Sequence, residues 1–491
     1  MRCGFTSTLF LCAAAAQLAL AAPASPADWP MFRGPQGAGV SESASIPTTF
    51  GPATNVLWKT PLPFGHSSPV IIGDRIFLTG AEGGNLQDSG RAEKVIDAGG
   101  KLFTFCLDKS SGKILWRREA PRPRIEIYQR TNSPASPSPA SDGRSVFVFL
   151  ADYGILAYGL DGNELWRTPL GPFNNVNGHG SSPIVWRDLV ILVCDQDTNS
   201  YIIALDKKTG RQRWRAERPE VTRSYVTPLV VEVPNAAPEL IVPGAYQVTA
   251  YHAATGEKLW WTRGFSWQPK SLPILHDGIV YVHGWEGGGE AETPTETPTW
   301  EQTLAQFDKN ADAKLTPDEV DERMRRSFYT LDLDGKGHLL QRDWDFYRAR
   351  RAARNTLLAI RPGGRGDITQ SHILWRMQKF LPNVPSPLIY RGVLYLVKDG
   401  GILTTLDPKT GSIHKQGRLT GALDTYYSSP VAAAGRVLLV SQNGVATLVK
   451  AAPDWEIEST LDLDEPVLAT PAILDGRIYL RTRGHLYCFG K

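Results

Sequence analysis

The segment LDKKTGRQRW, which runs from Leu205 to Trp214, decides the fold of this 491-residue chain because it recurs. A close copy, LDKSSGKILW, runs from Leu107 to Trp116, and variants end at Trp166 and Trp260. A chain built from copies of one unit takes its architecture from that repeat. The sequence therefore predicts one large repeat domain, although the length alone would suggest about three domains.

Each copy opens with a small or polar residue and a proline, followed by a short β-rich run such as VIIGDRIFLTG after Pro69. The opening prolines are Pro69, Pro139, Pro183, Pro228, Pro273, Pro387, Pro430 and Pro471. Successive gaps of 44, 45 and 45 residues separate the second to the fifth of them. Four short strands with tight turns need about that length, so we predict eight four-stranded propeller blades.

A tryptophan marks the last strand of seven copies. These residues are Trp58, Trp116, Trp166, Trp214, Trp260, Trp375 and Trp455, and Lys415 holds the equivalent place in the remaining copy. Trp58 precedes the first opening proline, and the final copy ends at Lys491 without a closing strand. Residues 55–62 are therefore predicted to complete blade 8 and to close the ring, which removes its free sheet edges. We expect the tryptophans to be structural, because each can bury about 150–250 Å² between blades.

This unit resembles the tryptophan-docking repeat of the pyrroloquinoline quinone-like propellers. That eight-bladed family includes quinoprotein alcohol dehydrogenases and the outer-membrane assembly lipoprotein of the β-barrel insertion machinery. The segment WPMFRGPQGAGVSE, from Trp29 to Glu42, is similar to the start of many exported bacterial members. The resemblance implies an all-β, eight-bladed propeller over nearly the whole mature chain, and it is specific for fold rather than activity. A WD40 propeller is disfavoured because no copy ends in Trp-Asp.

The N-terminus has the layout of a secretory signal peptide over residues 1–21, with Arg2, an apolar stretch from Leu9 to Leu20 and a small-residue cleavage site. Residues 22–54 are interpreted as a leader. We expect an exported protein, periplasmic or secreted, without a transmembrane segment. The net charge of +3 is small for this length and favours no nucleic-acid partner. We expect a monomer.

One interval between opening prolines is anomalous, since Pro273 and Pro387 stand 114 residues apart. The second strand of blade 5 ends near Gly284 and the third begins near Asn355. We therefore assign residues 55–284 and 355–491 to the propeller and residues 285–354 to a linker and a small α-helical insertion in blade 5. The insertion should stand over one mouth of the ring, beside the loops of 122–132, 171–180, 264–270 and 421–427.

The insertion contains the segment DKNADAKLTPDE, from Asp308 to Glu319, which fits a twelve-residue EF-hand calcium loop. Its predicted ligands are Asp308, Asn310, Asp312, the backbone carbonyl of Lys314, Thr316 and Glu319. Ala313 occupies the position where glycine supplies a positive φ, and a strain of about 1 kcal/mol should weaken binding. The alternative for this loop is an acidic surface helix-turn-helix without calcium.

A second loop, DLDGKGHLLQRD, offers Asp332, Asp334 and Asp343. Lys336 replaces one oxygen ligand, Leu340 offers none, and the closing aspartate is shorter than glutamate. We predict weak or no calcium binding here. The short spacing resembles compact EF-hand pairs of exported bacterial proteins, for which dissociation constants of about 10⁻⁴ to 10⁻³ M suffice.

Two functions from different classes remain open. In the first, the funnel binds pyrroloquinoline quinone and oxidises an alcohol or sugar. The dehydrogenases of the resembled family often carry a vicinal disulfide, this chain has no Cys-Cys pair, and the family's calcium-holding and catalytic residues match no motif here. The sequence therefore predicts no catalytic residue and does not favour the quinone.

In the second function, the propeller is a non-catalytic scaffold that binds an exported protein or envelope polymer, with the calcium module as a side arm. The predicted binding residues lie in loops expected at the mouth of the funnel. They are Arg124, Tyr128, Asn177, His179, Trp267 and Asp424.

Overall fold

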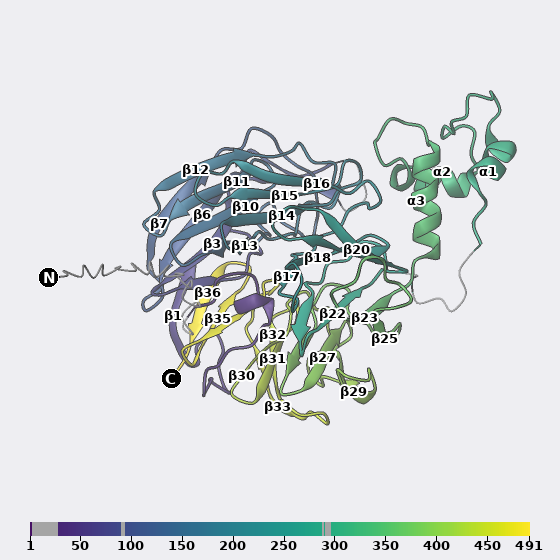
Figure 1. Ribbon diagram of the computed structural model, residues 1–491. Coiled ribbons are helices and arrows are strands. Elements are labelled where there is room, and N and C mark those ends of the chain that lie inside the picture. The colour runs from purple at the N-terminus through teal and green to yellow at the C-terminus, as the bar shows by residue number, and fades with distance from the viewer. Residues whose placement is uncertain (2–27, 90–93, 287–288, 290–295) are drawn as a thin grey trace.

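The computed structural model describes residues 1, 28–89, 94–286, 289 and 296–491. The predicted signal peptide lies outside the described residues apart from Met1. The chain is a β-propeller whose sheets surround a central axis, with a small helical insert that projects from the rim (Figure 1). No helix among the described residues is long and apolar enough to cross a membrane.

Each predicted repeat falls on a sheet of its own, and its opening proline stands directly before the first strand of that sheet. The first four sheets are β2 (Val70–Ile72), β3 (Arg75–Glu82), β6 (Lys101–Asp108), β7 (Ile114–Ala120); β9 (Ala140–Ser141), β10 (Ser145–Leu150), β11 (Gly154–Gly159), β12 (Glu164–Pro169); β13 (Ile184–Trp186), β14 (Leu189–Cys194), β15 (Tyr201–Asp206), β16 (Gln212–Glu217); and β17 (Leu229–Val231), β18 (Glu239–Gly244), β19 (Gln247–His252), β20 (Lys258–Arg263), with β24 (Gly366–Asp367) added at the edge.

The next four sheets continue around the ring and end at the C-terminus. They are β21 (Ile274–His276), β22 (Ile279–Gly284), β23 (Thr356–Ile360), β25 (Ile373–Met377); β26 (Leu388–Tyr390), β27 (Val393–Lys398), β28 (Ile402–Leu406), β29 (Ile413–Arg418); β30 (Val431–Ala433), β31 (Arg436–Val440), β32 (Val445–Lys450), β33 (Ile457–Asp462); and β34 (Ala472–Leu474), β35 (Arg477–Arg481), β36 (His485–Phe489), β1 (Val56–Pro61). A further small sheet contains β4 (Asn85–Asp88), β5 (Lys94–Ala98) and β8 (Tyr128–Gln129).

The apolar or polar character of each strand matches how far neighbouring sheets bury it. All six residues of β14 (LVILVC) are buried, because neighbouring sheets cover both faces of a middle strand. The outer strand β16 (QRWRAE) buries only Trp214, since its other residues face solvent or lie at the half-covered edge. First strands of neighbouring sheets contact one another, as β9 does β2 and β13, so the axis is lined by first strands.

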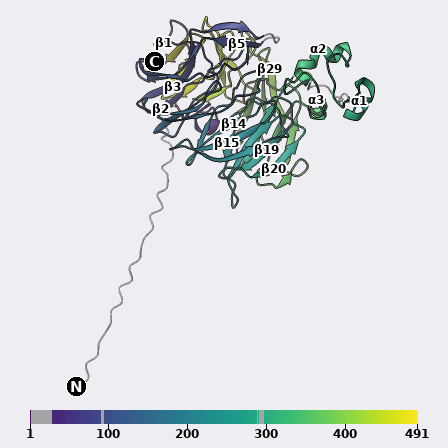
Figure 2. The same cartoon turned by 90° about the horizontal axis from the view of Figure 1, so that it is seen from above.

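The ring is closed by pairing between the two ends of the chain. Strand β1 runs antiparallel to β36, and Trp58 lies opposite Cys488. The N-terminal strand therefore supplies the outer strand of the last sheet and covers the edge that β36 would otherwise expose. Figure 2 shows β1 near the C-terminus.

The tryptophan and the glycine of the repeat motif contact each other across neighbouring sheets. Trp166 donates from its indole Nε1 to the carbonyl of Lys207 at 2.9 Å. Its ring covers Gly210, whose φ is 69° and whose added Cβ would stand 2.5 Å from the ring. Any side chain at this position would clash with the ring, so the repeat needs both residues. Trp58, Trp116 and Trp375 donate to a backbone carbonyl of the next sheet in the same way, whereas Trp260 donates to Glu239 within its own sheet.

The insert lies between β22 and β23. Its helices are α1 (Trp300–Phe307), α2 (Glu322–Leu331) and α3 (Gln341–Ala352). They surround a separate apolar core of Trp300, Leu315, Val320, Phe328, Leu331, Leu339 and Trp344. The capping box at Thr299, which accepts from the backbone N–H of Gln302, begins α1.

The leader packs into the ring from Asp28 onward and crosses between sheets that are distant in sequence. Trp29 exchanges two backbone hydrogen bonds with Ile71 of β2, at 2.7 and 2.9 Å. Pro30 accepts from Ser141 of β9, and Ser41 donates to Ala432 of β30. The short 3₁₀ helix η1 (Pro35–Gly37) contacts β17. The leader therefore ties together first strands from several parts of the ring.

Candidate functional site

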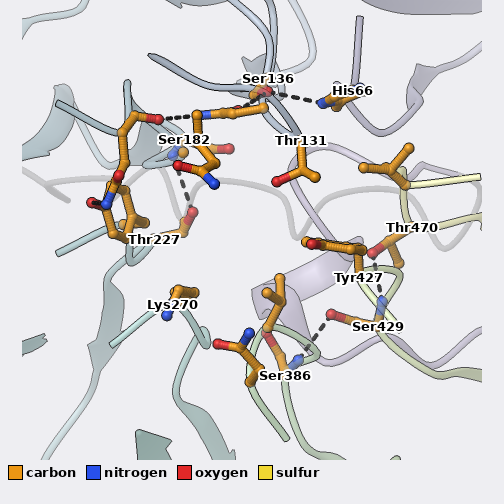
Figure 3. Close-up of a pocket in the computed structure, with 18 of the residues that line it drawn as sticks. His66, Thr131, Ser136, Ser182, Thr227, Lys270, Ser386, Tyr427, Ser429 and Thr470 are labelled. Carbon is orange, nitrogen blue, oxygen red and sulfur yellow. Dashed lines mark hydrogen bonds between the residues drawn. The ribbon is translucent and has the colours of Figure 1, made fainter. Parts of the chain in front are cut away.

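A cavity of about 470 Å³ lies at the axis of the propeller, on the face that carries the insert (Figure 3). Its wall combines polar side chains with aromatic rings and other apolar surface. The lining includes Gln129, Thr131, Asn132, Asn177, Tyr225, Gln268, Lys270, Trp285, Glu286, Asn383 and Tyr427. Such a volume and such convergent polar groups are typical of small-molecule sites.

Seven hydroxyl groups form a ring around the cavity, which we call the hydroxyl collar. Its members are Ser68, Ser138, Ser182, Thr227, Ser386, Ser429 and Thr470, and all seven line the cavity. Each stands directly before an opening proline. At the eighth such position, before Pro273, the chain has Leu272.

The collar is held by one hydrogen bond from a sheet to the next at seven of the eight steps around the ring. The backbone N–H of Ser138 donates to the hydroxyl of Ser182 at 2.9 Å, and the N–H of Ser182 donates to Thr227 at 3.1 Å. The same bond joins Thr470 to Ser68 at 3.0 Å, across the point where the ring closes. The backbone N–H of Leu272 donates to the hydroxyl of Ser386 as in the other copies. The leucine side chain has no hydroxyl, so it cannot accept a hydrogen bond from the N–H of Thr227.

Two opposite charges line the cavity near the insert. Glu286 receives the guanidinium of Arg350 from α3 at 2.8 and 3.2 Å. Burial raises the pKa of Glu286, although Arg350 acts against it. Burial lowers the pKa of Lys270 to about 8, and Glu286 opposes that shift. The ammonium group of Lys270 donates to the carbonyl of Gln268 at 3.1 Å.

The leader supplies the floor of the cavity through Phe32. Figure 3 shows the N-terminal ribbon behind the ring of side chains. The neighbouring Arg33 is fully buried, and burial lowers its pKa to about 9. One of its nitrogens donates to the carbonyl of Pro430 at 3.3 Å, whereas its Nε and Nη1 contact no acceptor in the described part of the chain.

A serine and a histidine meet at the wall, with the hydroxyl of Ser136 at 3.4 Å from Nδ1 of His66. Burial, together with Arg481 and Arg483, lowers the pKa of His66 to about 3. An imidazole with so low a pKa is a weak base at neutral pH, so this pair is poorly suited to activate a nucleophile.

Of the six residues expected at the mouth, Asn177 lines the cavity, where its amide donates to the hydroxyl of Tyr225 at 2.6 Å. The other five are not among the lining residues of the cavity. His179 is 3% exposed and packs edge-on against Phe149 and Phe173, because the loop folds its ring inward. Tyr128 is buried at 3% exposure, Arg124 pairs with Glu126, and Asp424 accepts from the backbone of Thr425 and Asn443.

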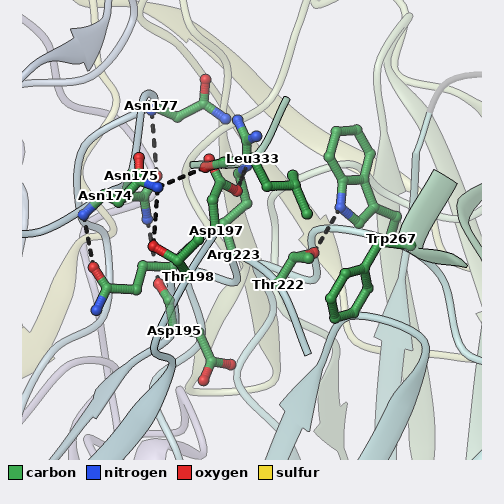
Figure 4. Close-up of polar contacts among 12 residues, drawn as sticks. Asn174, Asn175, Asn177, Asp195, Asp197, Thr198, Thr222, Arg223, Trp267 and Leu333 are labelled. Atoms are coloured by element: carbon green, nitrogen blue, oxygen red, sulfur yellow. Dashed lines mark hydrogen bonds and ion pairs between the residues drawn. The ribbon is translucent and has the colours of Figure 1, made fainter. Parts of the chain in front are cut away.

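Trp267, the sixth candidate, is part of the contact between propeller and insert. Its indole Nε1 donates to Thr222 at 3.0 Å, and the guanidinium of Arg350 stacks on its ring at 3.6 Å. At the other end of the insert, the amide of Asn174 donates to the carbonyl of Leu333 at 2.6 Å (Figure 4). The insert thus lies at the rim and contacts two of the four loops expected beside it, those of 171–180 and 264–270.

The loop of 308–319, called loop 1, has the hydrogen bonds of a tight turn around its acidic side chains. The two oxygens of Asp308 accept from the N–H groups of Ala311 and Ala313 at 2.8 and 3.0 Å. Glu319 accepts from the backbone and hydroxyl of Thr316 at 2.9 and 2.8 Å. Both alanines have positive φ, 59° and 60°, so the strain expected at Ala313 occurs twice.

The loop of 332–343, called loop 2, contains its own cation. The ammonium group of Lys336 lies 2.9 Å from a carboxylate oxygen of Asp334. Gly337 has a φ of 80°, without strain. Leu315 and Leu339 exchange backbone hydrogen bonds and so pair the two loops. Among the described residues, no three His, Cys, Asp or Glu side chains are arranged as a metal site.

The collar is the part of the site that the sequence-based reasoning missed. The signal was present, because a hydroxyl residue precedes seven of the eight opening prolines. Reading it as a collar needs the knowledge that all these positions face one axis, and that follows only from closure of the ring.

The family model described as "Outer membrane protein assembly factor BamB" matches residues 44–288. Among solved structures, a europium-containing methanol dehydrogenase is 11% identical with a TM-score of 0.57, covering 95% of this chain and 98% of that one. The quinohemoprotein alcohol dehydrogenase from Comamonas testosteroni is 12% identical with a TM-score of 0.56, covering 96% and 82%. The computationally designed Ika8 protein is 11% identical with a TM-score of 0.51, covering 89% and 100%. No curated protein matches.

Proposed function

We propose that this chain, which belongs to the PQQ-like repeat β-propellers, is an exported, calcium-binding scaffold. It would bind a partner without catalysis. The partner would be an exported protein or an envelope polymer. The likeness to solved dehydrogenases is a likeness of fold, and at identities of 11% and 12% it does not extend to their activity.

The observation that carries this proposal is the attachment of the insert to the face on which the cavity lies. Arg350 of α3 holds Glu286, which lines the cavity, and Asn355 donates to the carbonyl of Glu286 at 3.0 Å. The other end of the insert is held through Leu333. Two separate attachments fix the module relative to the cavity, so together they present one continuous surface to a partner.

Calcium binding is proposed for loop 1. Its carboxylate, amide, hydroxyl and carbonyl oxygens are the hard donors that Ca²⁺ prefers. The carboxylates now accept hydrogen bonds from the loop backbone, and binding would turn their free lone pairs toward the ion. We expect a dissociation constant of about 10⁻⁴ to 10⁻³ M, which suits an extracellular module that supports the folded insert rather than signals.

The residues of the cavity do not fit quinone-dependent oxidation. Removal of a proton from an alcohol needs a free general base near neutral pH. Glu286 is the one carboxylate among the described lining residues, and Arg350 already holds it. The three cysteines of the described chain, Cys106, Cys194 and Cys488, are free and buried, so no disulfide faces the axis.

The test compares the mature protein with and without pyrroloquinoline quinone and Ca²⁺ in a dye-linked assay with primary alcohols and aldoses. We expect no dye reduction above the protein-free control. Quinone-dependent reduction that disappears in Glu286→Gln would replace the scaffold proposal with a dehydrogenase.

Binding of a partner is tested by photo-crosslinking in cells. A photoreactive residue would replace Leu423, which is 60% exposed in the loop leading to Tyr427, or Tyr329, which is 53% exposed on α2. The matched control is Leu57, 42% exposed on the outer strand β1. We expect a discrete adduct from the first two positions, and adducts only from Leu57 would contradict the proposed face.

A further inference from the structure

A second cavity, of about 650 Å³, lies between the helical insert and the propeller, away from the axis. We call it the insert cleft. Residues of α1, α2 and α3 form one wall, and Ser266, Trp267 and Asn355 belong to the opposite wall. Glu286 lines both this cleft and the axial cavity. The volume of the insert cleft is in the range of ligand-binding sites.

Three arginines line the insert cleft without a carboxylate partner among the described residues. Arg323 of α2 and Arg351 of α3 make no side-chain hydrogen bond or ion pair with any described residue. Arg354 donates from Nη1 to the carbonyl of Ala353 at 2.8 Å, whereas its Nη2 is buried and contacts no acceptor in the described part of the chain. A buried donor without an acceptor is costly, so an acceptor that enters the cleft would be bound favourably.

The acidic residues of the cleft do not neutralise these arginines. Glu286 holds Arg350, and Asp321 accepts from the backbone N–H of Met324 at 2.7 Å as the N-cap of α2. Glu296 is exposed and forms no ion pair with a described residue. The guanidinium groups of the cleft are therefore available to an anion from outside the chain.

Apolar side chains and hydroxyl groups stand beside the arginines. Phe307 of α1, Met324 of α2 and Tyr347 of α3 line the cleft and are partly buried. Ser327 and Thr330 add hydroxyl groups, which can donate and accept. A sugar ring has an apolar face and a rim of hydroxyls, so these two kinds of side chain match its two kinds of surface.

We propose that the insert cleft binds an acidic polysaccharide whose carboxylates pair with Arg323, Arg351 and Arg354. This inference rests on the proposed scaffold function and names its partner as an envelope polymer with carboxylates on its sugar units. A guanidinium group binds a carboxylate through two parallel hydrogen bonds, and such charge-assisted bonds are the strong ones. Because the arginines come from α2 and from the end of α3, a polymer with repeated carboxylates would engage more than one of them.

The walls of the cleft favour a polysaccharide over an acidic peptide. An extended peptide carries a backbone N–H and C=O at almost every residue, and these groups commonly pair with an exposed sheet edge. No described lining residue of the insert cleft lies in a strand, and the helices of its wall already bond their own backbone groups. A uronate unit presents hydroxyls and a carboxylate, which arginine, serine and threonine side chains can bind.

The experiment titrates tri-galacturonate into the full mature protein by calorimetry in the presence of Ca²⁺. Cellotriose is the neutral saccharide, and penta-glutamate is the acidic peptide. We expect tri-galacturonate to bind, cellotriose not to bind, and penta-glutamate to bind at least about tenfold more weakly. Added salt should weaken the binding of tri-galacturonate, because salt screens exposed charges.

Arg351→Gln and Arg354→Gln should each weaken the binding of tri-galacturonate about tenfold. Arg351→Lys keeps the charge but not the two-pronged geometry, so it should recover only part of the affinity. The matched control is Arg348→Gln, which removes the same charge from α3 at a residue that does not line the cleft. Its affinity should equal that of the parent.

Near-ultraviolet circular dichroism and the melting temperature are measured for every variant. If Arg354→Gln does not fold, Arg323→Gln and Arg351→Gln carry the test. The proposal is overturned if tri-galacturonate does not bind below about 10 mM, if cellotriose or penta-glutamate binds as tightly, or if Arg351→Gln binds like Arg348→Gln.

The same measurements separate this inference from the scaffold function. Absence of saccharide binding, in a protein that shows no quinone-dependent dye reduction, refutes the polysaccharide and leaves the scaffold. Quinone-dependent dye reduction that disappears in Glu286→Gln, with tri-galacturonate still bound by the parent, refutes the scaffold and leaves the polysaccharide site.

Discussion

Loops 1 and 2 of the insert share a backbone and differ in what neutralises their acidic groups. Both have positive φ at the same two places, at Ala311 and Ala313 in loop 1 and at Gly335 and Gly337 in loop 2. In loop 2 the ammonium group of Lys336 lies against Asp334. Loop 1 has no such internal ion pair among the described contacts, and its carboxylates accept from its own backbone instead.

Single residues can therefore give different roles to loops that share one backbone conformation. Loop 2 carries its own cation and glycines that adopt its backbone freely, so it is complete without an ion. It also faces the propeller, through the carbonyl of Leu333. Loop 1 has strained alanines and exposed acids, so it gains more from an external cation. We therefore expect loop 2 to attach the insert to the propeller and loop 1 to bind calcium.

The largest expected effect is loss of calcium binding in Glu319→Gln. Glutamate at the last position supplies two of the ligand oxygens, so we expect at least about a hundredfold weaker binding. Calorimetry on the full mature protein should give one site in the parent and none in this variant. Asp334→Asn, the control in loop 2, should keep that site. Two equal sites in the parent would contradict the assignment of loop 2.

Lys336→Asp should convert loop 2 into a second, weaker site. The substitution removes the internal ammonium and adds an oxygen ligand, so we expect a stoichiometry of two with a new dissociation constant of about 10⁻³ M. Lys309→Asp, in loop 1 at a position that supplies no ligand, is the control and should leave one site. A stoichiometry that stays at one would show that Leu340, and not Lys336, prevents binding.

Ala313→Gly should tighten calcium binding about fivefold, because it relieves a strain of about 1 kcal/mol at a positive φ. Its mirror test is Gly337→Ala in loop 2, which should destabilise the insert by a similar amount. Intrinsic fluorescence of the buried Trp300 and Trp344 reports unfolding of the insert. Unchanged affinity in Ala313→Gly would mean that the strained φ is not kept in the calcium-bound loop.

The smallest effect concerns pH, and it has opposite signs in the two loops. Burial raises the pKa of Asp343, so its contribution to stability is present below the unfolded pKa and decreases as the pH rises through the folded pKa. Asp343→Asn cannot ionise and should gain stability relative to the parent as the pH rises from about 4 to about 7. Denaturant titrations at both values measure this difference, and parallel pH curves would contradict it.

Glu319 provides the counterpart in loop 1. The backbone and hydroxyl of Thr316 lower its pKa, so its contribution is present above the unfolded pKa and is lost as the pH falls through the folded pKa. Without calcium, Glu319→Gln should therefore be least stable relative to the parent at neutral pH. The gap should close in acid.

Much of the propeller could be predicted because its signals are local and repeated. Pro183 marks the start of β13, and Trp214 marks the outer strand of the same sheet. The stretched interval after Pro273 located three helices at residues 300–352, and the strand after them resumes at Thr356. Each of these features depends on residues within one repeat, where burial and turn chemistry decide the outcome.

The site could be predicted only in part, because its residues meet through long-range contacts. Loop membership placed Asn177 on the cavity, but it could not show that His179, two residues later, turns inward against Phe173. Nor could it show that Trp267 lies under Arg350 of the insert. A loop position fixes the face on which a residue lies, and only packing fixes the direction of its side chain.

The sequence by itself determined the repeat, its strands, the structural role of its tryptophans and the place of the insertion, since these follow from periodic burial and backbone preference. Only the tertiary structure decided that seven hydroxyls form one collar and that the leader supplies the floor. The physical reason is closure: residues such as Ser68 and Thr470 become neighbours only when the ring brings the two ends of the chain together.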